Sequence, residues 1–227
     1  MITLYQFKSC PFCSKVRALL NFSKTPYEVV EVTPRGMKEL EGVTDHRKVP
    51  VLKDGDEVIV ESATIIEYIN KNYAKLPVNK DDKKWTDWLD NKMVHYLPPL
   101  IHPDFKTSFN NIKKISPAGG LKGLIVPFVG AMIMPKVARK MKEKHNIQNP
   151  QKEYLAAIDH WVNEGLNRKD YFGGKEASFV DCSVFGVLRS GHQLGVVKMA
   201  KDHNKHFAIW YDKCYPQMSG DRVSNPK

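Results

Sequence analysis

The sequence predicts a small α/β domain with a mixed sheet, followed by an all-helical region. Short apolar runs alternate with helical patterns through residues 1–76, whereas nothing after residue 84 alternates like a strand. Pro77 and the charged, polar residues up to 83 mark a linker between the two regions. With 227 residues, 42% hydrophobic and 26% charged, the composition is that of a globular protein and excludes a mainly disordered or low-complexity chain.

The first region, residues 1–76, contains seven predicted elements. The helix that begins at Pro11 has Phe12, Val16 and Leu19 at helical spacing, and Asp54-Gly55-Asp56 is typical of a hairpin turn. In chain order we expect a strand at Ile2–Phe7, a helix at Pro11–Phe22, a strand at Tyr27–Val32, a short helix at Pro34–Glu41, strands at Val49–Leu52 and Val58–Val60, and a helix at Ala63–Tyr73.

The second region, residues 84–227, shows only helical periodicity. We expect helices at Trp85–Leu97, within 104–145, at Gln151–Asn167, at Phe179–Gln193 and at His203–Tyr211. The predicted domains are therefore 1–76, a linker at 77–83, and 84–227.

The net charge of +10 is concentrated in one segment. Residues 106–144 contain nine Lys or Arg and one acid, Glu143, around the apolar run Leu124–Met134. That run is too short for a transmembrane helix, which needs about 20 residues. An amphipathic segment here could contact an anionic membrane, form a dimer, or present an ordinary solvated face. Dimerisation is favoured because Pro127 and Pro135 should interrupt a long regular helix.

Other features of the sequence bear on compartment and partners. Four cysteines are too few for a disulfide scaffold and no secretory signal is evident, so we expect a reducing, cytoplasmic environment with contact limited to membrane surfaces. No nucleic-acid reader motif accompanies the basic charge, and nucleic acid is not an expected partner.

Cys10-Pro11-Phe12-Cys13 is the strongest chemical motif, because it follows a predicted strand and opens a predicted helix. The unpaired amides at the helix N-terminus should lower the pKa of Cys10, with help from Lys8, and make it the nucleophile. Cys13, one turn further, can resolve a mixed disulfide with Cys10. These two cysteines are the predicted catalytic residues.

Metal binding is not predicted. A zinc site would need a second ligand pair, and no other Cys-x-x-Cys is present. Cys182 and Cys214 stand apart and are expected to be buried small hydrophobes. His203-x-x-His206 is expected to be two exposed histidines.

The residues from Leu4 to Arg17 resemble the active-site strand and helix of glutaredoxins, and more closely the glutaredoxin-like part of the prostaglandin E synthase 2 family. The segment Arg47–Leu52 resembles the Val-Pro loop whose cis-proline faces the cysteines in thioredoxin-fold proteins. Glu61-Ser62 resembles the acidic-Ser pair that holds the γ-glutamyl end of glutathione in glutathione transferases. The resemblance implies a thioredoxin-like first domain that binds glutathione through Phe12, Lys48, Val49, Pro50, Glu61 and Ser62.

Physical chemistry also supports glutathione binding by these residues. The Val49 backbone can pair like an edge strand with the cysteinyl unit of glutathione. Ser62 at a helix N-terminus presents a hydroxyl and amides to a carboxylate, and Glu61 can pair with an ammonium group. The alternative for Ser62 is simple helix capping.

The resemblance extends through the helical region, which is similar to that of glutathione transferases. Ser178-x-x-Asp181 is typical of a capping box, a structural role in which Ser and Asp satisfy each other's backbone donors. The chain departs from the family at Phe7, where the family has a tyrosine whose hydroxyl could hydrogen-bond the reacting atoms.

By resemblance, the function is a glutathione- or thiol-dependent isomerase that converts prostaglandin H2 to prostaglandin E2, acting as a homodimer on a hydrophobic peroxide. Members of the family are reported to bind haem, but this chain has no Cys-x-x-Cys-His signature, so haem follows from the resemblance alone. The first alternative is a glutaredoxin-like thiol–disulfide oxidoreductase, which the intact cysteine pair supports equally. The second is a non-enzymatic assembly module, against which a low-pKa cysteine argues.

Overall fold

The computed structural model describes residues 1–34, 36–115 and 122–220. Its contacts divide them into two compact units. Unit 1 consists of Met1–Thr86, Lys169–Ser190 and the described residues from Ile209 on, and unit 2 consists of Asp87–Arg168 and Gly191–Ala208. The predicted domains, 1–76 and 84–227 with a linker at 77–83, stay a prediction. They divide the chain at one place, whereas unit 1 joins residues 1–86 to helices from later in the sequence.

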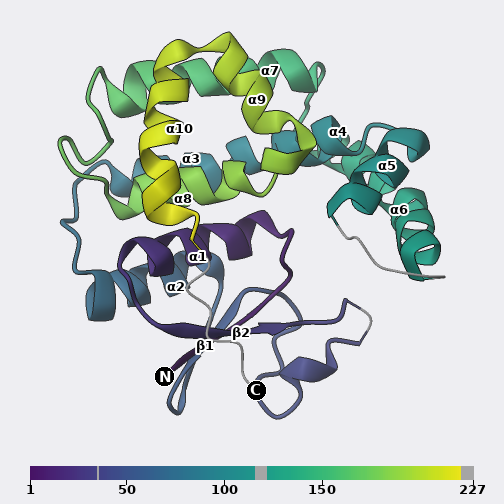
Figure 1. Ribbon diagram of the computed structural model, residues 1–227, viewed down its shortest axis with the longest axis horizontal. Helices are drawn as coiled ribbons and strands as arrows, with labels where there is room; N and C mark the ends of the chain where they lie inside the picture. Colours follow the sequence, from purple (N-terminus) through teal and green to yellow (C-terminus); the bar gives the residue numbers. More distant parts are fainter. Residues whose placement is uncertain (35, 116–121, 221–227) are drawn as a thin grey trace. The chain divides into compact units, whose positions relative to one another are not determined.

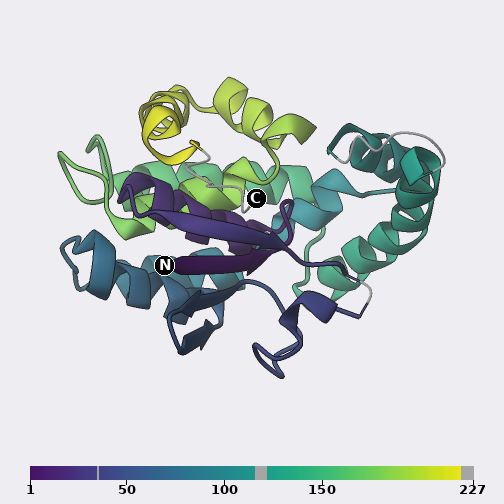
Figure 2. The ribbon, with the colours of Figure 1, turned by 60° about the horizontal axis from the view of Figure 1, so that its bottom comes forward.

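Unit 1 is built on a four-stranded mixed sheet with the order β2-β1-β3-β4. The strands are β1 (Ile2–Gln6), β2 (Tyr27–Glu31), β3 (Val51–Asp54) and β4 (Glu57–Val60). Strand β1 pairs parallel with β2 and antiparallel with β3, which forms a hairpin with β4. In Figure 2 the N-terminal strand is β1, which lies between β2 and β3.

Helices cover one face of this sheet. Helices α1 (Pro11–Phe22) and α2 (Ser62–Ile69) pack side by side on one face (Figure 1). Their inward residues, such as Val16, Leu19 and Ile65, are fully buried. A separate cluster of Val32, Leu40 and Val51 forms under the segment that contains the short 3-10 helix η1 (Lys38–Leu40).

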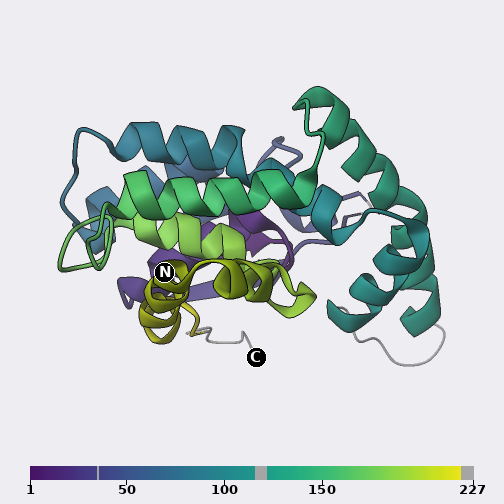
Figure 3. The same ribbon diagram turned by 90° about the horizontal axis from the view of Figure 1, so that it is seen from above.

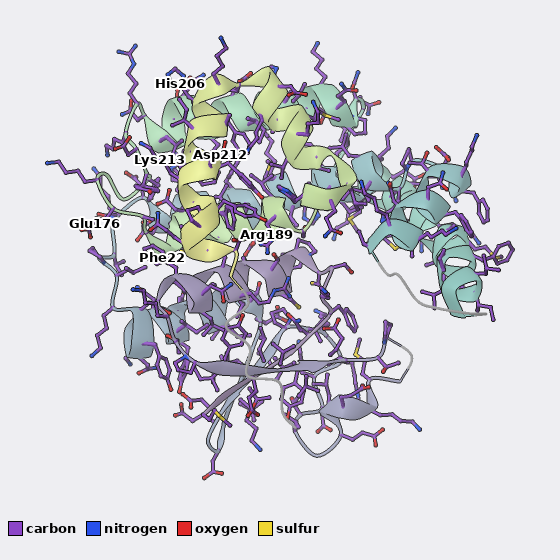
Figure 4. All side chains as sticks on the ribbon, viewed as in Figure 1. Phe22, Glu176, Arg189, His206, Asp212 and Lys213 are labelled. Atoms are coloured by element: carbon purple, nitrogen blue, oxygen red, sulfur yellow. The ribbon has the colours of Figure 1, made fainter. Side chains whose placement is uncertain are left out.

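Helix α8 (Phe179–Arg189) packs against α1 and completes unit 1. It begins with the predicted capping box, which is confirmed: the Ser178 hydroxyl accepts from the Asp181 amide, and Asp181 accepts from the Ser178 amide. In Figure 4 the side chain of Arg189 extends toward the last turn of α10 (Lys205–Met218), where it donates to the Ser219 carbonyl at 2.7 Å.

Unit 2 contains helices only, among the residues that the structure describes. They are the last part of α3 (Asp82–Asn91), η3 (Met93–Tyr96), α4 (Leu97–Ile101), α5 (Phe105–Ile115), α6 (Lys122–Lys144), α7 (Pro150–His160), η4 (Trp161–Leu166), η5 (His192–Leu194), α9 (Val196–His203) and the start of α10. Helices α5 and α6 pack against each other as a hairpin (Figure 3).

The structure corrects one expectation about this hairpin. Helix α6 runs without a break through Pro127 and Pro135, which were expected to interrupt it. The buried residues Pro127, Ala131 and Ala138 share the face that packs on neighbouring helices. We attribute the continuity to this packing, which offsets the lost hydrogen bonds. The predicted segment 106–144 includes 116–121, which lie outside the described residues.

The remaining predicted elements differ mainly at their ends. Helix Pro11–Phe22 is confirmed residue for residue, and the Ala63–Tyr73 helix becomes α2 followed by a π-helical turn, η2 (Asn70–Ala74). Helix α9 was not predicted, and Asn204 separates it from α10. Cys182 and Cys214 are fully buried, as expected.

Candidate active site

The sheet brings three loops to one edge. Tyr5, next to the end of β1, pairs with Val51 at the start of β3, and Val51 pairs with Val60 at the end of β4. The loop to Cys10 leaves β1, the Val49-Pro50 segment enters β3, and Glu61 follows β4, all at this end of the sheet. The register therefore gathers the predicted site segments along one sheet edge.

Cys10 is the N-cap of α1 and is half-buried, with Pro11 at the first helical position. The pKa of Cys10 is lowered to about 7, chiefly because the Cys13 side chain donates a hydrogen bond to it. Burial opposes this shift, while the backbone amides of Cys13 and Phe12 and the charge of Arg17 support it. Cys10 is consequently a substantially ionised thiol near neutral pH.

Cys13 lies in the opposite environment. It is fully buried, and burial together with its hydrogen bond to Cys10 raises the pKa of Cys13 far above the usual range. Both cysteines are reduced. The two sulfurs thus differ in reactivity: Cys10 is available as a thiolate, and Cys13 serves as its hydrogen-bond donor.

Arg17 is a cation whose charge helps to lower the pKa of Cys10. Its guanidinium donates to the Gln6 side chain and to the Lys8 carbonyl, the latter at 2.9 Å. Glu31, at the end of β2, accepts from the Gln6 amide at 3.1 Å and from the Lys8 backbone N–H. This chain of hydrogen bonds fixes the loop between β1 and Cys10.

Glu61 and Ser62 begin α2 at the same sheet edge. The Val49-Pro50 bond beside them is cis, as the resemblance implied. Glu61 has a φ of 62°, which is uncommon for a residue other than glycine and costs on the order of 1–3 kcal/mol. Ser62 is buried as the first residue of α2.

Two basic side chains face Glu61. Its carboxylate lies 3.7 Å from His46 Nε2 and 3.8 Å from Lys48 Nζ. Lys48 and Glu61 are exposed and His46 is half-buried, so these pairs contribute little to stability. The Glu61 carboxylate instead lies beside two basic side chains at the start of α2.

Comparisons with known proteins agree with this arrangement. A family model described as glutathione S-transferase, N-terminal domain, matches residues 4–77. Prostaglandin E synthase 2 of Danio rerio is 29% identical, over 93% of this chain and 70% of the relative, and that of Mus musculus is 27% identical, over 92% and 68%. This chain is similar to prostaglandin E synthase 2 over nearly its whole length.

The fold class is confirmed by the same comparisons. Human glutathione S-transferase T1-1 in its apo form superposes with a TM-score of 0.64 at 17% identity, covering 98% of this chain and 86% of that one. The chain thus has a thioredoxin-like N-terminal sheet with helices, followed by an all-helical region like that of glutathione transferases.

Sequence reasoning found most of the segments at this sheet edge and missed three residues. Arg17 lies seven residues after Cys10, two helical turns away, a spacing that could have identified it as a nearby cation. Glu31 and His46 carry no local signal, because only the sheet register and the loop path place them here. Phe12, named as a ligand contact, is half-exposed with the Lys15 ammonium 5.6 Å from its ring centre.

The described residues outside this edge hold no further candidate for the predicted chemistry. In residues 1–34, 36–115 and 122–220, no three His, Cys, Asp or Glu side chains are grouped so that they could hold a metal ion. His203 of the His-x-x-His pair lies 2.8 Å from Asp159. Haem has no support beyond the resemblance.

Proposed function

We propose that this protein is a glutathione-dependent isomerase that converts prostaglandin H2 to prostaglandin E2. The observation that carries the proposal is the Cys10 thiol, whose pKa of about 7 makes it a nucleophile at neutral pH. The similarity to prostaglandin E synthase 2 along nearly the whole chain supports the choice of reaction.

Glutathione would lie along the sheet edge beside Cys10. In this proposal the backbone of Val49, next to Pro50, pairs with the cysteinyl unit of the tripeptide. The Ser62 hydroxyl and the N-terminal amides of α2 bind the γ-glutamyl carboxylate, and Glu61 pairs with its ammonium group. Lys48, close to Glu61, and Phe12, next to Cys10, complete the binding surface.

The chemistry requires one nucleophilic sulfur, either Cys10 or a glutathione thiolate beside it. The thiolate attacks one endoperoxide oxygen, so that a sulfur–oxygen bond forms and the oxygen–oxygen bond breaks. The second oxygen leaves as an alkoxide and takes up a proton. The carbon that bears the sulfur-linked oxygen then loses its proton to solvent, its carbonyl forms, and the thiolate is expelled unchanged. The reaction has no net oxidation or reduction.

Phe7 cannot assist this mechanism with a side-chain hydrogen bond. Its carbonyl accepts from the Cys10 amide at 3.0 Å, but its ring offers no hydrogen bond to the reacting oxygen. The reaction must therefore proceed without a phenol at this position, and Cys10 with its Cys13 donor carries the activation of the sulfur.

The direct test is product analysis of prostaglandin H2 incubated with the protein and glutathione. We expect prostaglandin E2 from the native protein and from Cys13→Ser, and no rate above background from Cys10→Ser. If Cys10→Ser forms prostaglandin E2 as fast as the native protein, the attacking sulfur is that of glutathione and not Cys10; if the native protein with glutathione forms none above background, the proposal fails.

Glutathione binding can be tested separately by calorimetry. For Glu61→Ala/Ser62→Ala we expect an affinity at least about tenfold lower, because each lost charge-assisted hydrogen bond is worth roughly 1.5–3 kcal/mol. Glu41→Ala is a matched control at an exposed glutamate of the same region. Equal affinity of the double variant and the control would remove Glu61 and Ser62 from the site.

A second candidate is a glutaredoxin-like thiol–disulfide oxidoreductase, favoured by the buried Cys13 sulfur within hydrogen-bond contact of Cys10. In that reaction Cys10 attacks a mixed disulfide and releases its thiol, and Cys13 or a second glutathione then attacks the sulfur of the adduct. A glutathionylated peptide assay distinguishes the two candidates. Turnover of the peptide without formation of prostaglandin E2 would select the oxidoreductase.

A further inference from the structure

The α5–α6 hairpin exposes an unusual number of large apolar side chains. We name as the apolar tip Phe105 of α5 and seven residues of α6: Leu124, Ile125, Val126, Phe128, Val129, Met132 and Ile133. Each is between 44% and 57% exposed. Contiguous exposed apolar surface of this kind marks an interaction site.

Phe105 and Phe128 pack edge to face across the two helices, with their ring centres 5.6 Å apart, yet 44% and 52% of these two residues stay exposed. Pro127, Ala131 and Ala138 face inward and are buried. Gly130 lies so close to Ile112 of α5 that a Cβ atom there would fall 2.5 Å from the Ile112 side chain. The two helices are thus already in close contact, and about half of the surface of the apolar tip remains exposed.

The tip also contains a hollow. Phe109, Leu124, Ile125 and Phe128 line an apolar recess of about 310 Å³ between α5 and α6. A recess with this lining can accept hydrocarbon and offers almost nothing to a polar ligand.

Basic side chains continue the same surface. We name as the basic collar the exposed residues Lys106, Lys113 and Lys114 of α5 and Lys136, Arg139, Lys140 and Lys144 of α6. Along α6 the exposed residues therefore change from apolar, up to Ile133, to basic, from Lys136 on. Glu143 is the one acid between Lys106 and Lys144, and it lies 3.8 Å from Arg139.

We propose that the apolar tip and the basic collar dock this protein on the surface of an anionic lipid bilayer. Apolar side chains enter the boundary between headgroups and acyl chains, and the collar binds the headgroups. Within residues 1–34, 36–115 and 122–220, none of the helices combines the length and the hydrophobicity of a membrane span.

Charge distinguishes this occupant from a second copy of the chain. A two-fold interface would bring the same patch of both copies together, placing one basic collar near the other. An anionic bilayer complements the net +8 of residues 106–144, which self-association would oppose. The continuous α6 also removes the reason for preferring dimerisation, which was the expected interruption at the prolines.

The test is flotation of the full chain with vesicles of phosphatidylcholine alone and of phosphatidylcholine with phosphatidylserine, at low and high salt. We expect binding to the anionic vesicles at low salt, and at least about tenfold weaker partitioning at high salt or on neutral vesicles. Val129→Ser/Ile133→Ser and Lys136→Gln/Lys140→Gln should each weaken binding to anionic vesicles by about tenfold or more.

Matched controls lie at exposed positions outside the hairpin. Ile209→Ser, and Lys152→Gln/Lys175→Gln, should bind the anionic vesicles like the native protein. Two outcomes would overturn the proposal: no binding to anionic vesicles at low salt, or equal loss of binding in tip variants and controls. Light scattering that finds a dimer disrupted by Val129→Ser/Ile133→Ser, without vesicle binding, would assign the surface to self-association instead.

Discussion

Gly186 of α8 lies directly against the backbone of Lys15 in α1. A Cβ atom at Gly186 would fall 2.4 Å from Lys15 Cα and 2.6 Å from the Ser14 carbonyl oxygen. Neither backbone atom can rotate away, so only glycine permits this approach of the two helices. Since α1 carries both cysteines, the contact also fixes the support of the candidate active site.

Gly186→Ala is therefore expected to destabilise the protein by about 1–3 kcal/mol, the usual cost of overpacking a core. The displacement of α1 should also alter the alkylation rate of Cys10. Urea denaturation and iodoacetamide labelling measure the two effects. Gly220→Ala is the control, because a Cβ atom there meets nothing within 4 Å. Equal stability of the two variants would show that α1 and α8 are not in this contact.

Cys13 should control the pKa of Cys10 through its hydrogen bond. Labelling of Cys10 by iodoacetamide is expected to rise with pH through a midpoint of about 7 in the native protein. Cys13→Ser keeps a donor and should leave the midpoint nearly unchanged, whereas Cys13→Ala removes the donor and should raise it toward the ordinary value for cysteine. Mass spectrometry identifies the labelled residue. Labelling of Cys13 before Cys10 would reverse the assignment of the nucleophile.

Local chemistry explains what could be predicted from the sequence. Pro11 and the apolar spacing after it define α1, and Asp54-Gly55 defines the β3–β4 hairpin, because each signal lies within a few residues of the feature it specifies. The cysteine motif and the Val49-Pro50 segment were found for the same reason.

Contacts distant in sequence explain what was missed. The approach of Gly186 to Lys15 joins residues that are far apart in the sequence, and no pattern near either residue indicates it. The path of α6 through two prolines depends on its buried face, which propensity ignores. The φ of Glu61 likewise follows from the junction of β4 and α2 and from no property of glutamate.

Arg17, and not Lys8, should be the side chain whose charge assists Cys10. Arg17→Gln is expected to raise the midpoint of Cys10 labelling by a few tenths of a pH unit, because the charge is the smallest of the influences on its pKa. High salt should reduce the difference between this variant and the native protein. Lys8→Gln is the matched control, with no expected shift. A larger shift for Lys8→Gln than for Arg17→Gln would contradict the assignment.

Asp181 should be the most sensitive position of the second region, because its buried carboxylate joins three segments of unit 1. It accepts from the backbone amides of Phe172 and Ser178 at 2.9 and 2.8 Å, and from the indole Nε1 of Trp210 at 3.0 Å. Asp181→Asn keeps the size of the side chain but turns one acceptor into a donor that faces other donors. We expect it to cost about 2–4 kcal/mol, since hydrogen bonds to a charged group are worth roughly 1.5–3 kcal/mol and buried donors would lose their partner.

Trp210→Phe removes the indole donor, worth about 1–2 kcal/mol, and also leaves a cavity where the larger ring was fully buried, so it should destabilise the protein as well. The control is Asp170→Asn, because Asp170 pairs with Lys213 at 2.6 Å on the surface, where an ion pair contributes at most about 1 kcal/mol. Urea denaturation of Asp181→Asn, Trp210→Phe and Asp170→Asn measures the loss in free energy of unfolding for each variant. If Asp181→Asn is no less stable than Asp170→Asn, the buried carboxylate does not hold the start of α8 to the loop at Phe172 and to α10.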